Sequence, residues 1–131
     1  MVRFNHQYGI APYSGTVAVT QNSRYLTSST FNSDPEYIHV SRQCEQVGTL
    51  LKLSAPIRID VRRIADTGPF ALFDINMKPN ITGSERPGRE NQTSLMAMGA
   101  QGLGWNYPML LQYMLQLAKP LSELRRVKVY S

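Results

Sequence analysis

Residues 57–76 read IRIDVRRIADTGPFALFDIN, and their apolar and polar side chains alternate on both sides of residues 66–68. A period of two is typical of β-strands with one face on a core and the other in water. The Asp-Thr-Gly between the two runs predicts a hairpin whose three-residue loop puts Gly68 in the left-handed position and Ala65 opposite Pro69. The predicted apolar face carries Ile57, Ile59 and Val61 on the first strand and Phe73 and Ile75 on the second.

This register sets two carboxylates against each other. Asp60 falls opposite Asp74, and Arg58 falls opposite Asn76, with all four side chains on the polar face. Carboxylates this close repel each other unless one binds a proton or a cation neutralises both. Carboxylate and amide oxygens suit Mg²⁺, which leaves part of its coordination shell to water and substrate phosphates. The pattern is interpreted as a metal–nucleotide phosphate site in which Arg58 holds an anionic oxygen.

The same pattern also fits a hairpin that binds no ligand. Charged side chains alternate on many solvated strand faces, and Arg58 could then form an ion pair with Asp74. The metal interpretation also depends on the register, because a slip of one residue would turn one carboxylate to the other face. The pattern alone leaves both interpretations open.

A helix with a clear start signal precedes the hairpin. Asp34 can cap it, and Pro35 fits its first turn. The helix should end before Pro56, because a proline disfavours helical geometry in the preceding residue. Its predicted apolar face steps by four, three and four residues through Val40, Cys44, Val47 and Leu51.

Two further helices are predicted downstream of the hairpin. Thr93 or Ser94 can cap a short one that runs to about Gln101, and Asn106 can cap a longer one that Pro120 interrupts. The apolar stripe of the longer helix carries Leu110, Leu111, Met114 and Leu117.

The remaining chain is predicted to be mostly loop. A strand is expected at 16–20 and a second near 25–26. Residues 77–92 are rich in Pro, Gly and Asn and are predicted to form a loop. With 131 residues the chain suits a single domain, and the fold class predicted is α+β, a small antiparallel sheet with packed helices.

Composition excludes some classes of protein and favours none strongly. The chain has a formal net charge of +5, but its basic residues are scattered, so nucleic-acid binding rests on charge alone and is not expected. Cys44 is the only cysteine, which rules out an internal disulfide, and with two histidines in the chain we expect no zinc site. No apolar run reaches the roughly 20 residues that span a bilayer. We expect no membrane partner and a cytoplasmic location.

The hairpin and the helices around it resemble the ATP-grasp superfamily, and within it the D-alanine–D-alanine ligases. The similarity runs over 40–118 and includes Arg-Ile-Asp at 58–60, FDINMKPNIT at 73–82, Thr-Ser-Leu at 93–95 and the helix after Gly-Trp at 104–105. It implies that 1–131 is one partial ATP-grasp domain, the C-terminal subdomain. The lead-in is 1–33, the matching region 34–118 and the tail 119–131.

The resemblance implies roles for particular residues. Asp60, Asp74 and Asn76 would hold Mg²⁺ (or Mn²⁺) that bridges the phosphates of ATP. Arg58 would act as the catalytic residue that steadies the transferring phosphoryl group or an oxyanion. Ser94 and Leu95 would approach the substrate carboxylate at a helix N-terminus, where anions are favoured. A simple helix cap is the alternative for Ser94.

Three departures from the family pattern are visible. Asp74 stands where the family usually has Glu, Asn80 replaces a usual Gly, and 84–92 is an insertion. The shorter acid can still bind a metal, whereas the change at Asn80 puts backbone donation to an oxyanion in doubt. Further candidate phosphate contacts, each with a solvated side chain as the alternative, are Lys78, Arg86 and Arg89.

The function expected is part of an ATP-dependent carboxylate–amine ligase that uses a carboxylate and an amine as substrates. The chain has no Gly-rich phosphate loop and no room for the lobe that closes over ATP, so we expect it to need that N-terminal ATP-grasp lobe and to be inactive alone. The alternative is a non-catalytic interaction module on a truncated or degenerate ATP-grasp scaffold. A homodimer is left open.

Overall fold

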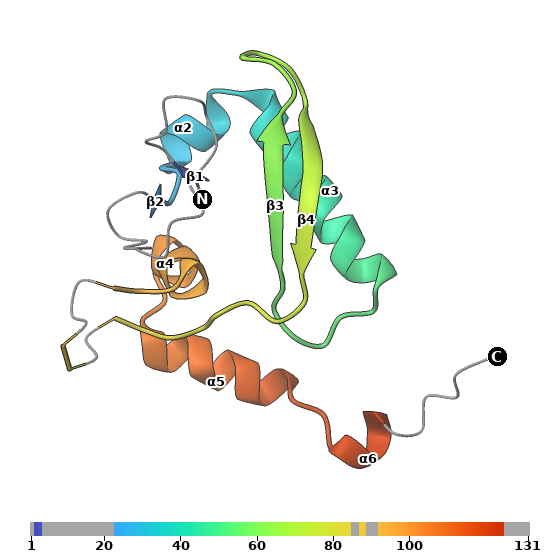
Figure 1. Ribbon diagram of the computed structural model, residues 1–131, viewed down its shortest axis with the longest axis vertical. Helices are drawn as coiled ribbons and strands as arrows, with labels where there is room; N and C mark the ends of the chain where they lie inside the picture. The colour runs from blue at the N-terminus through green and yellow to red at the C-terminus, as the bar shows by residue number, and fades with distance from the viewer. Residues whose placement is uncertain (1, 4–22, 85–86, 89–91, 125–131) are drawn as a thin grey trace.

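The computed structural model describes residues 2–3, 23–84, 87–88 and 92–124 and is of the α+β class (Figure 1). Two antiparallel two-stranded sheets, β1–β2 and β3–β4, are combined with helices. The elements in chain order are β1 (Val2–Arg3), β2 (Ser23–Arg24), α2 (Ser28–Asn32), α3 (Pro35–Leu50), β3 (Arg58–Arg63), β4 (Phe70–Asn76), α4 (Leu95–Gly102), α5 (Tyr107–Leu117) and α6 (Leu121–Leu124).

Helix α3 begins as its sequence predicts. The Asp34 side chain accepts a hydrogen bond from the backbone N–H of Glu36 at 3.0 Å, and Pro35 is the first helical residue. Val40 is buried, while Cys44 and Val47 are half-buried, so these three lie on the packed side of the helix. The predicted stripe is wrong at its end. Leu51 lies beyond the last helical residue and is 50% exposed.

The C-terminus of α3 is closed by a left-handed residue that is not glycine. Lys52 has φ 50°, and its N–H donates to the carbonyl of Thr49. The N–H of Leu53 donates to the carbonyl of Gly48 at 3.2 Å, which completes a Schellman motif. These bonds end the helix several residues before Pro56, and a pattern of apolar residues does not report them.

The β3–β4 hairpin differs from its predicted form at the turn. Ile64 pairs with Pro69 through a 3.1 Å backbone hydrogen bond, so the loop has four residues and Ala65 does not face Pro69. The N–H of Gly68 donates to the carbonyl of Ala65, and Gly68 is not left-handed. A turn with an i to i+3 hydrogen bond satisfies the backbone here without the positive φ that was expected.

A β-bulge then restores the predicted pairing along the rest of the hairpin. Val61 pairs with Leu72, but the next step pairs Asp60 with Asp74, which leaves Phe73 as the extra residue. Phe73 is 80% exposed, whereas Leu72 and Ile75 are 39% and 41% exposed. The apolar face of β4 therefore carries Leu72 with Ile75, and the placement of Phe73 beside Ile75 was wrong.

Helix α3 lies behind the hairpin in Figure 1 and contacts its apolar face. The ring of Tyr37 on α3 lies 5.5 Å from the ring of Phe70 on β4, measured between centroids. Phe70 pairs with Arg63, and Ile59, Val61 and Arg63 share one face of β3. The polar face of the hairpin is consequently turned away from α3.

Helices α4 and α5 begin at the predicted caps. Ser94 accepts from the N–H of Ala97 at 3.1 Å, and Asn106 accepts from the N–H of Met109 at 2.9 Å. The loop from β4 runs back over these helices, where the carbonyl of Thr82 accepts from the N–H of Ser94. Gly83 lies so close to Tyr107 that a Cβ there would come within 2.9 Å of the ring.

The N-terminal elements are shorter than predicted or were not expected. The strand near 25–26 was wrong in position, because β2 ends at Arg24. Helix α2 arises where a loop was expected, and Thr27 caps it by accepting from the N–H of Thr30 at 3.2 Å. Its sequence, SSTFN, carries no apolar repeat that could predict it. The strand expected at 16–20 lies outside the described residues.

The described core is small and lies in α3, α4 and α5. The buried apolar residues there are Val40, Met98, Ala100 and Leu110. Many large apolar side chains are exposed, among them Leu115 and Tyr113 on α5, a helix whose eleven residues include no charged one. Across the described ranges, no helix has the length and apolar character needed to cross a bilayer.

Candidate functional site

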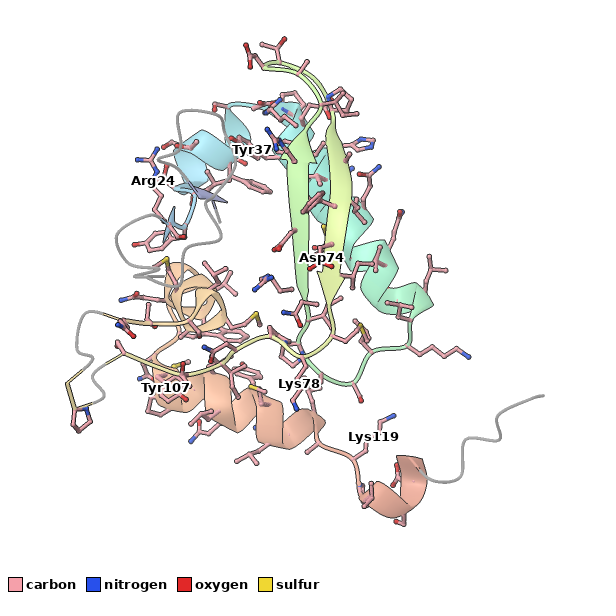
Figure 2. The ribbon with its side chains drawn as sticks, viewed as in Figure 1. Arg24, Tyr37, Asp74, Lys78, Tyr107 and Lys119 are labelled. Carbon is pink, nitrogen blue, oxygen red and sulfur yellow. The ribbon has the colours of Figure 1, made fainter. Side chains whose placement is uncertain are left out.

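Two carboxylates meet on the polar face of the hairpin. Asp60 and Asp74 are direct partners in the β3–β4 register, and Arg58 and Asn76 are partners two residues further along. Figure 2 shows Asp74 on β4, in the half of the hairpin far from the turn. The structure therefore brings together the four hairpin residues that the sequence singled out.

Arg58 holds Asp60 and not Asp74. Its Nε donates to Oδ1 of Asp60 at 2.8 Å, and its Nη2 donates to Oδ2 at 3.0 Å. This fork engages both carboxylate oxygens with parallel N–H donors, the strongest form of an Arg–carboxylate pair. The Arg58–Asp74 ion pair of the ligand-free interpretation was wrong, because the partner on the same strand is closer to the guanidinium.

Asp74 is the exposed member of the pair. Among the residues that the structure describes, its side chain has no hydrogen-bond or ion-pair partner. Its carboxylate is therefore open to solvent and to a cation that approaches from solution. This asymmetry follows from the strand geometry, since Arg58 and Asp60 are separated by two residues and share a face.

Asn76 already uses its amide oxygen locally. Oδ1 accepts from the backbone N–H of Lys78 at 2.9 Å, which turns the chain out of β4. An amide oxygen has two lone pairs, so one stays available to a ligand. Lys78 is exposed just after this turn (Figure 2).

The oxygen donors on this face are of the type that Mg²⁺ prefers, but they are too few to fill its coordination shell. Two carboxylates and an amide are hard oxygen donors, which Mg²⁺ prefers. The described parts of the chain contain no cluster of three or more His, Cys, Asp or Glu side chains suited to a metal. A metal held here would keep water or phosphate oxygens in its remaining positions, as Mg²⁺ commonly does.

The second predicted region is a helix start with its hydroxyl already engaged. Ser94 is 4% exposed, and its Oγ caps α4, which is the alternative raised from the sequence. Leu95 is the first residue of that helix. No described hydrogen bond or ion pair joins either residue to the hairpin. Arg86 and Arg89 lie outside the described residues, as does any contact they make.

Sequence reasoning missed a cluster at the turn end of the hairpin. Arg63 forms an ion pair with Asp34, donates to the carbonyl of Gly68 at 2.8 Å, and lies 4.4 Å above the ring of Phe70. Burial lowers the pKa of Arg63, but the hydrogen bonds to Asp34 and Tyr37 raise it more, so the guanidinium stays charged. The sequence signal that could have predicted this cluster is the position of Arg63 on the otherwise apolar face of β3.

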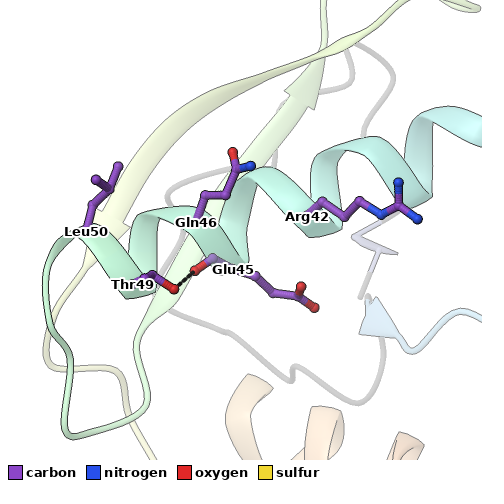
Figure 3. A pocket seen from close by; sticks show the side chains of 5 residues that line it. All are labelled: Arg42, Glu45, Gln46, Thr49 and Leu50. Atoms are coloured by element: carbon purple, nitrogen blue, oxygen red, sulfur yellow. Dashed lines mark hydrogen bonds between the residues drawn. The ribbon is translucent and has the colours of Figure 1, made fainter.

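A hollow on α3 lies away from these residues (Figure 3). Its volume is about 520 Å³, and its lining residues come from the exposed face of this one helix. They are Arg42, Glu45, Gln46, Thr49 and Leu50. A surface formed by a single helix face lacks the convergent polar groups of a ligand site.

Comparison with known proteins adds no assignment. No family model, no curated protein and no solved structure matches the chain. The ATP-grasp resemblance and the ligand set it implies therefore stay predictions that rest on residues 40–118 themselves.

Proposed function

We propose that this chain is part of an ATP-dependent carboxylate–amine ligase of the D-alanine–D-alanine ligase type, the part that holds Mg²⁺ and the ATP phosphates. The observation that carries the proposal is the direct opposition of Asp60 and Asp74 beside Arg58 and Asn76. The motifs at 58–60 and 73–82 are the residues that resemble the family. The pairing of β3 with β4 supports the proposal because it brings the polar residues of the two motifs together on one face of the hairpin.

Each residue has a part in this proposal. Asp60, Asp74 and the free lone pair of Asn76 would hold the metal, which would supply positive charge to neutralise the phosphates. Arg58 donates to phosphate oxygens as charge develops on them. Lys78, exposed after β4, meets an outer phosphate oxygen as a point charge.

The expected reaction has two steps, activation of a carboxylate by ATP and attack by an amine. The substrate carboxylate attacks the terminal phosphorus of ATP and releases ADP, and the amine then displaces phosphate from the activated carboxyl group. In this proposal the lobe that covers ATP is a separate part of the enzyme, and the amine is a substrate. The chain is expected to bind nucleotide without completing the reaction alone.

Calorimetric titration of the chain with ADP, with and without Mg²⁺, tests the proposal. We expect binding in the millimolar range that requires Mg²⁺ and is lost in Asp60→Asn plus Asp74→Asn. Asp66→Asn is the matched control, because Asp66 is an exposed carboxylate in the turn of the same hairpin. Metal-dependent binding that persists in the double variant would overturn the proposed site.

A different observation supports a second candidate, a non-catalytic interaction module that pairs with a second copy of this chain. Helix α5 has no charged residue but exposes Met109, Tyr113 and Leu115. Several exposed apolar side chains on one uncharged helix are typical of a surface that another molecule covers. Two chains of net charge +5 repel each other, so an uncharged helix is where they can meet.

Light scattering after size exclusion tests this candidate. A concentration-dependent dimer should appear in the native chain and be lost in Leu115→Lys, which puts a charge on the exposed side of α5. Gln46→Lys is the control, since Gln46 lies on the exposed side of α3. A chain that stays monomeric at high concentration excludes the module.

A further inference from the structure

The Arg58 fork raises a question about how a metal enters the site. The guanidinium engages both oxygens of Asp60, at 2.8 and 3.0 Å, and both side chains are partly buried, with 30% and 40% of their surfaces exposed. A cation that binds Asp60 must approach within coordination distance of the same oxygens. Each carboxylate oxygen keeps a lone pair for the cation, but the cation is repelled by the guanidinium charge and meets a carboxylate that this charge already neutralises.

We propose that Arg58 is a built-in counter-ion for Asp60, which phosphate draws away so that the metal can bind, and that metal and phosphate therefore bind cooperatively. The inference rests on the proposed function and adds the regulation of that site. Alone, Mg²⁺ meets an Asp60 that Arg58 already neutralises, and Asp74 is the carboxylate of the pair that keeps its full charge. A phosphate anion gives the Arg58 fork a second partner with two acceptor oxygens and frees Asp60.

The arrangement on the hairpin face supports an exchange of this kind. Arg58 lies directly opposite Asn76, which carries no charge, so no second carboxylate competes for the guanidinium at its own register position. Asp74, opposite Asp60, has no partner within the described ranges and can anchor the metal while Asp60 is released. Reciprocity requires the metal to favour phosphate by the same factor.

The chain supplies a matched control on the same strand. Arg62 lies two residues beyond Asp60 on the same face, is exposed, and makes no ion pair with any described residue. Arg58→Gln and Arg62→Gln each remove one positive charge near Asp60. Only the first removes the fork, so a comparison of the two separates the fork from general charge.

The test is a Mg²⁺ titration of the whole chain by ¹H–¹⁵N NMR at constant ionic strength, followed at the backbone of Asp60 and Asp74. Arg58→Gln should strengthen binding of Mg²⁺ alone by about fivefold, from Coulomb repulsion screened by salt. Arg62→Gln should change it by less than about twofold, because its charge is more distant. Arg58→Lys, which keeps the charge without the fork, should fall between them and guards against misfolding of one variant.

Inorganic phosphate supplies the second half of the test. Millimolar phosphate should strengthen Mg²⁺ binding by the native chain about fivefold or more, shift the Arg58 Nε–H resonance, and have little effect on Arg58→Gln. Equal responses from the Arg58 and Arg62 variants, or independent binding of phosphate and Mg²⁺, overturn the inference while leaving the metal site intact. No Mg²⁺ binding by any variant, with or without ADP, overturns the proposed function as well.

Discussion

Asp60 of β3 lies directly opposite Asp74 of β4, although the neighbouring pair, Val61 and Leu72, follows a register shifted by one residue. The bulge at Phe73 accounts for the shift. At the bulge two consecutive residues of β4, Phe73 and Asp74, lie opposite the single residue Asp60 on the polar side of the hairpin. Bulges re-aim side chains near functional sites, and this one returns Ile75 to the face that packs on α3.

Substitution of the two phenylalanines of β4 should have very different costs. Phe70→Ala removes the ring that contacts both Arg63 and Tyr37 and is expected to lower the free energy of unfolding by about 2–3 kcal/mol. Phe73→Ala removes a ring that is 80% exposed and should change it by less than about 0.5 kcal/mol. Urea unfolding measures both. A hairpin without the bulge would reverse the order, because Phe73 would then share the packed face with Ile75.

The elements predicted best were those with a cap and a spacing in the sequence. Asp34 and Asn106 each mark a helix start, and the alternation on either side of 66–68 marks two strands. The turn and the bulge could not be predicted, because a period of two does not count the residues in a loop or reveal one extra residue. The described residues test the fold class, and the ATP-grasp assignment stays a prediction.

The pairing of Asp60 with Asp74 was predicted for an incomplete reason. A loop one residue longer than expected shifts the register one way, and the bulge at Phe73 shifts it back. The two differences cancel beyond Val61. The partner of Arg58 could not be predicted either, because Asp60 along the strand and Asp74 across it are both within reach of a long side chain.

Lys52 offers a test of the C-terminus of α3. Lys52→Gly should stabilise the chain by about 0.5–1 kcal/mol, since glycine adopts φ near 50° without the steric cost that a Cβ brings. Lys52→Ala is the matched control. It removes the same charge and the same long side chain but keeps the Cβ, so it should give no such gain. Equal effects of the two substitutions would argue against a left-handed residue here.

Cys44 should react slowly with alkylating reagents in the folded chain. Burial raises the pKa of its thiol, and the charge of Glu45 raises it further, so less thiolate forms at mildly alkaline pH. The stability from keeping this thiol protonated is complete below its unfolded pKa and is lost as pH rises through the raised folded value. Iodoacetamide labelling across a pH series measures the inflection, with the chain in urea as the unfolded reference. The same inflection in both states would contradict the burial of this residue.

Two glycine-to-alanine substitutions should change stability in opposite directions. At Gly48, inside α3, the nearest atom to a new Cβ is Leu53 Cδ1 at 3.8 Å, so Gly48→Ala should stabilise by about 0.5–1 kcal/mol through helix propensity. At Gly83 a new Cβ would lie 2.9 Å from the Tyr107 ring, and Gly83→Ala should cost about 1–3 kcal/mol. If the clash with the ring is the cause, the same change should cost little in a Tyr107→Ala background. An undiminished cost in that background would mean that Gly83 is needed for its backbone, and that the loop after β4 reaches α5 by another contact.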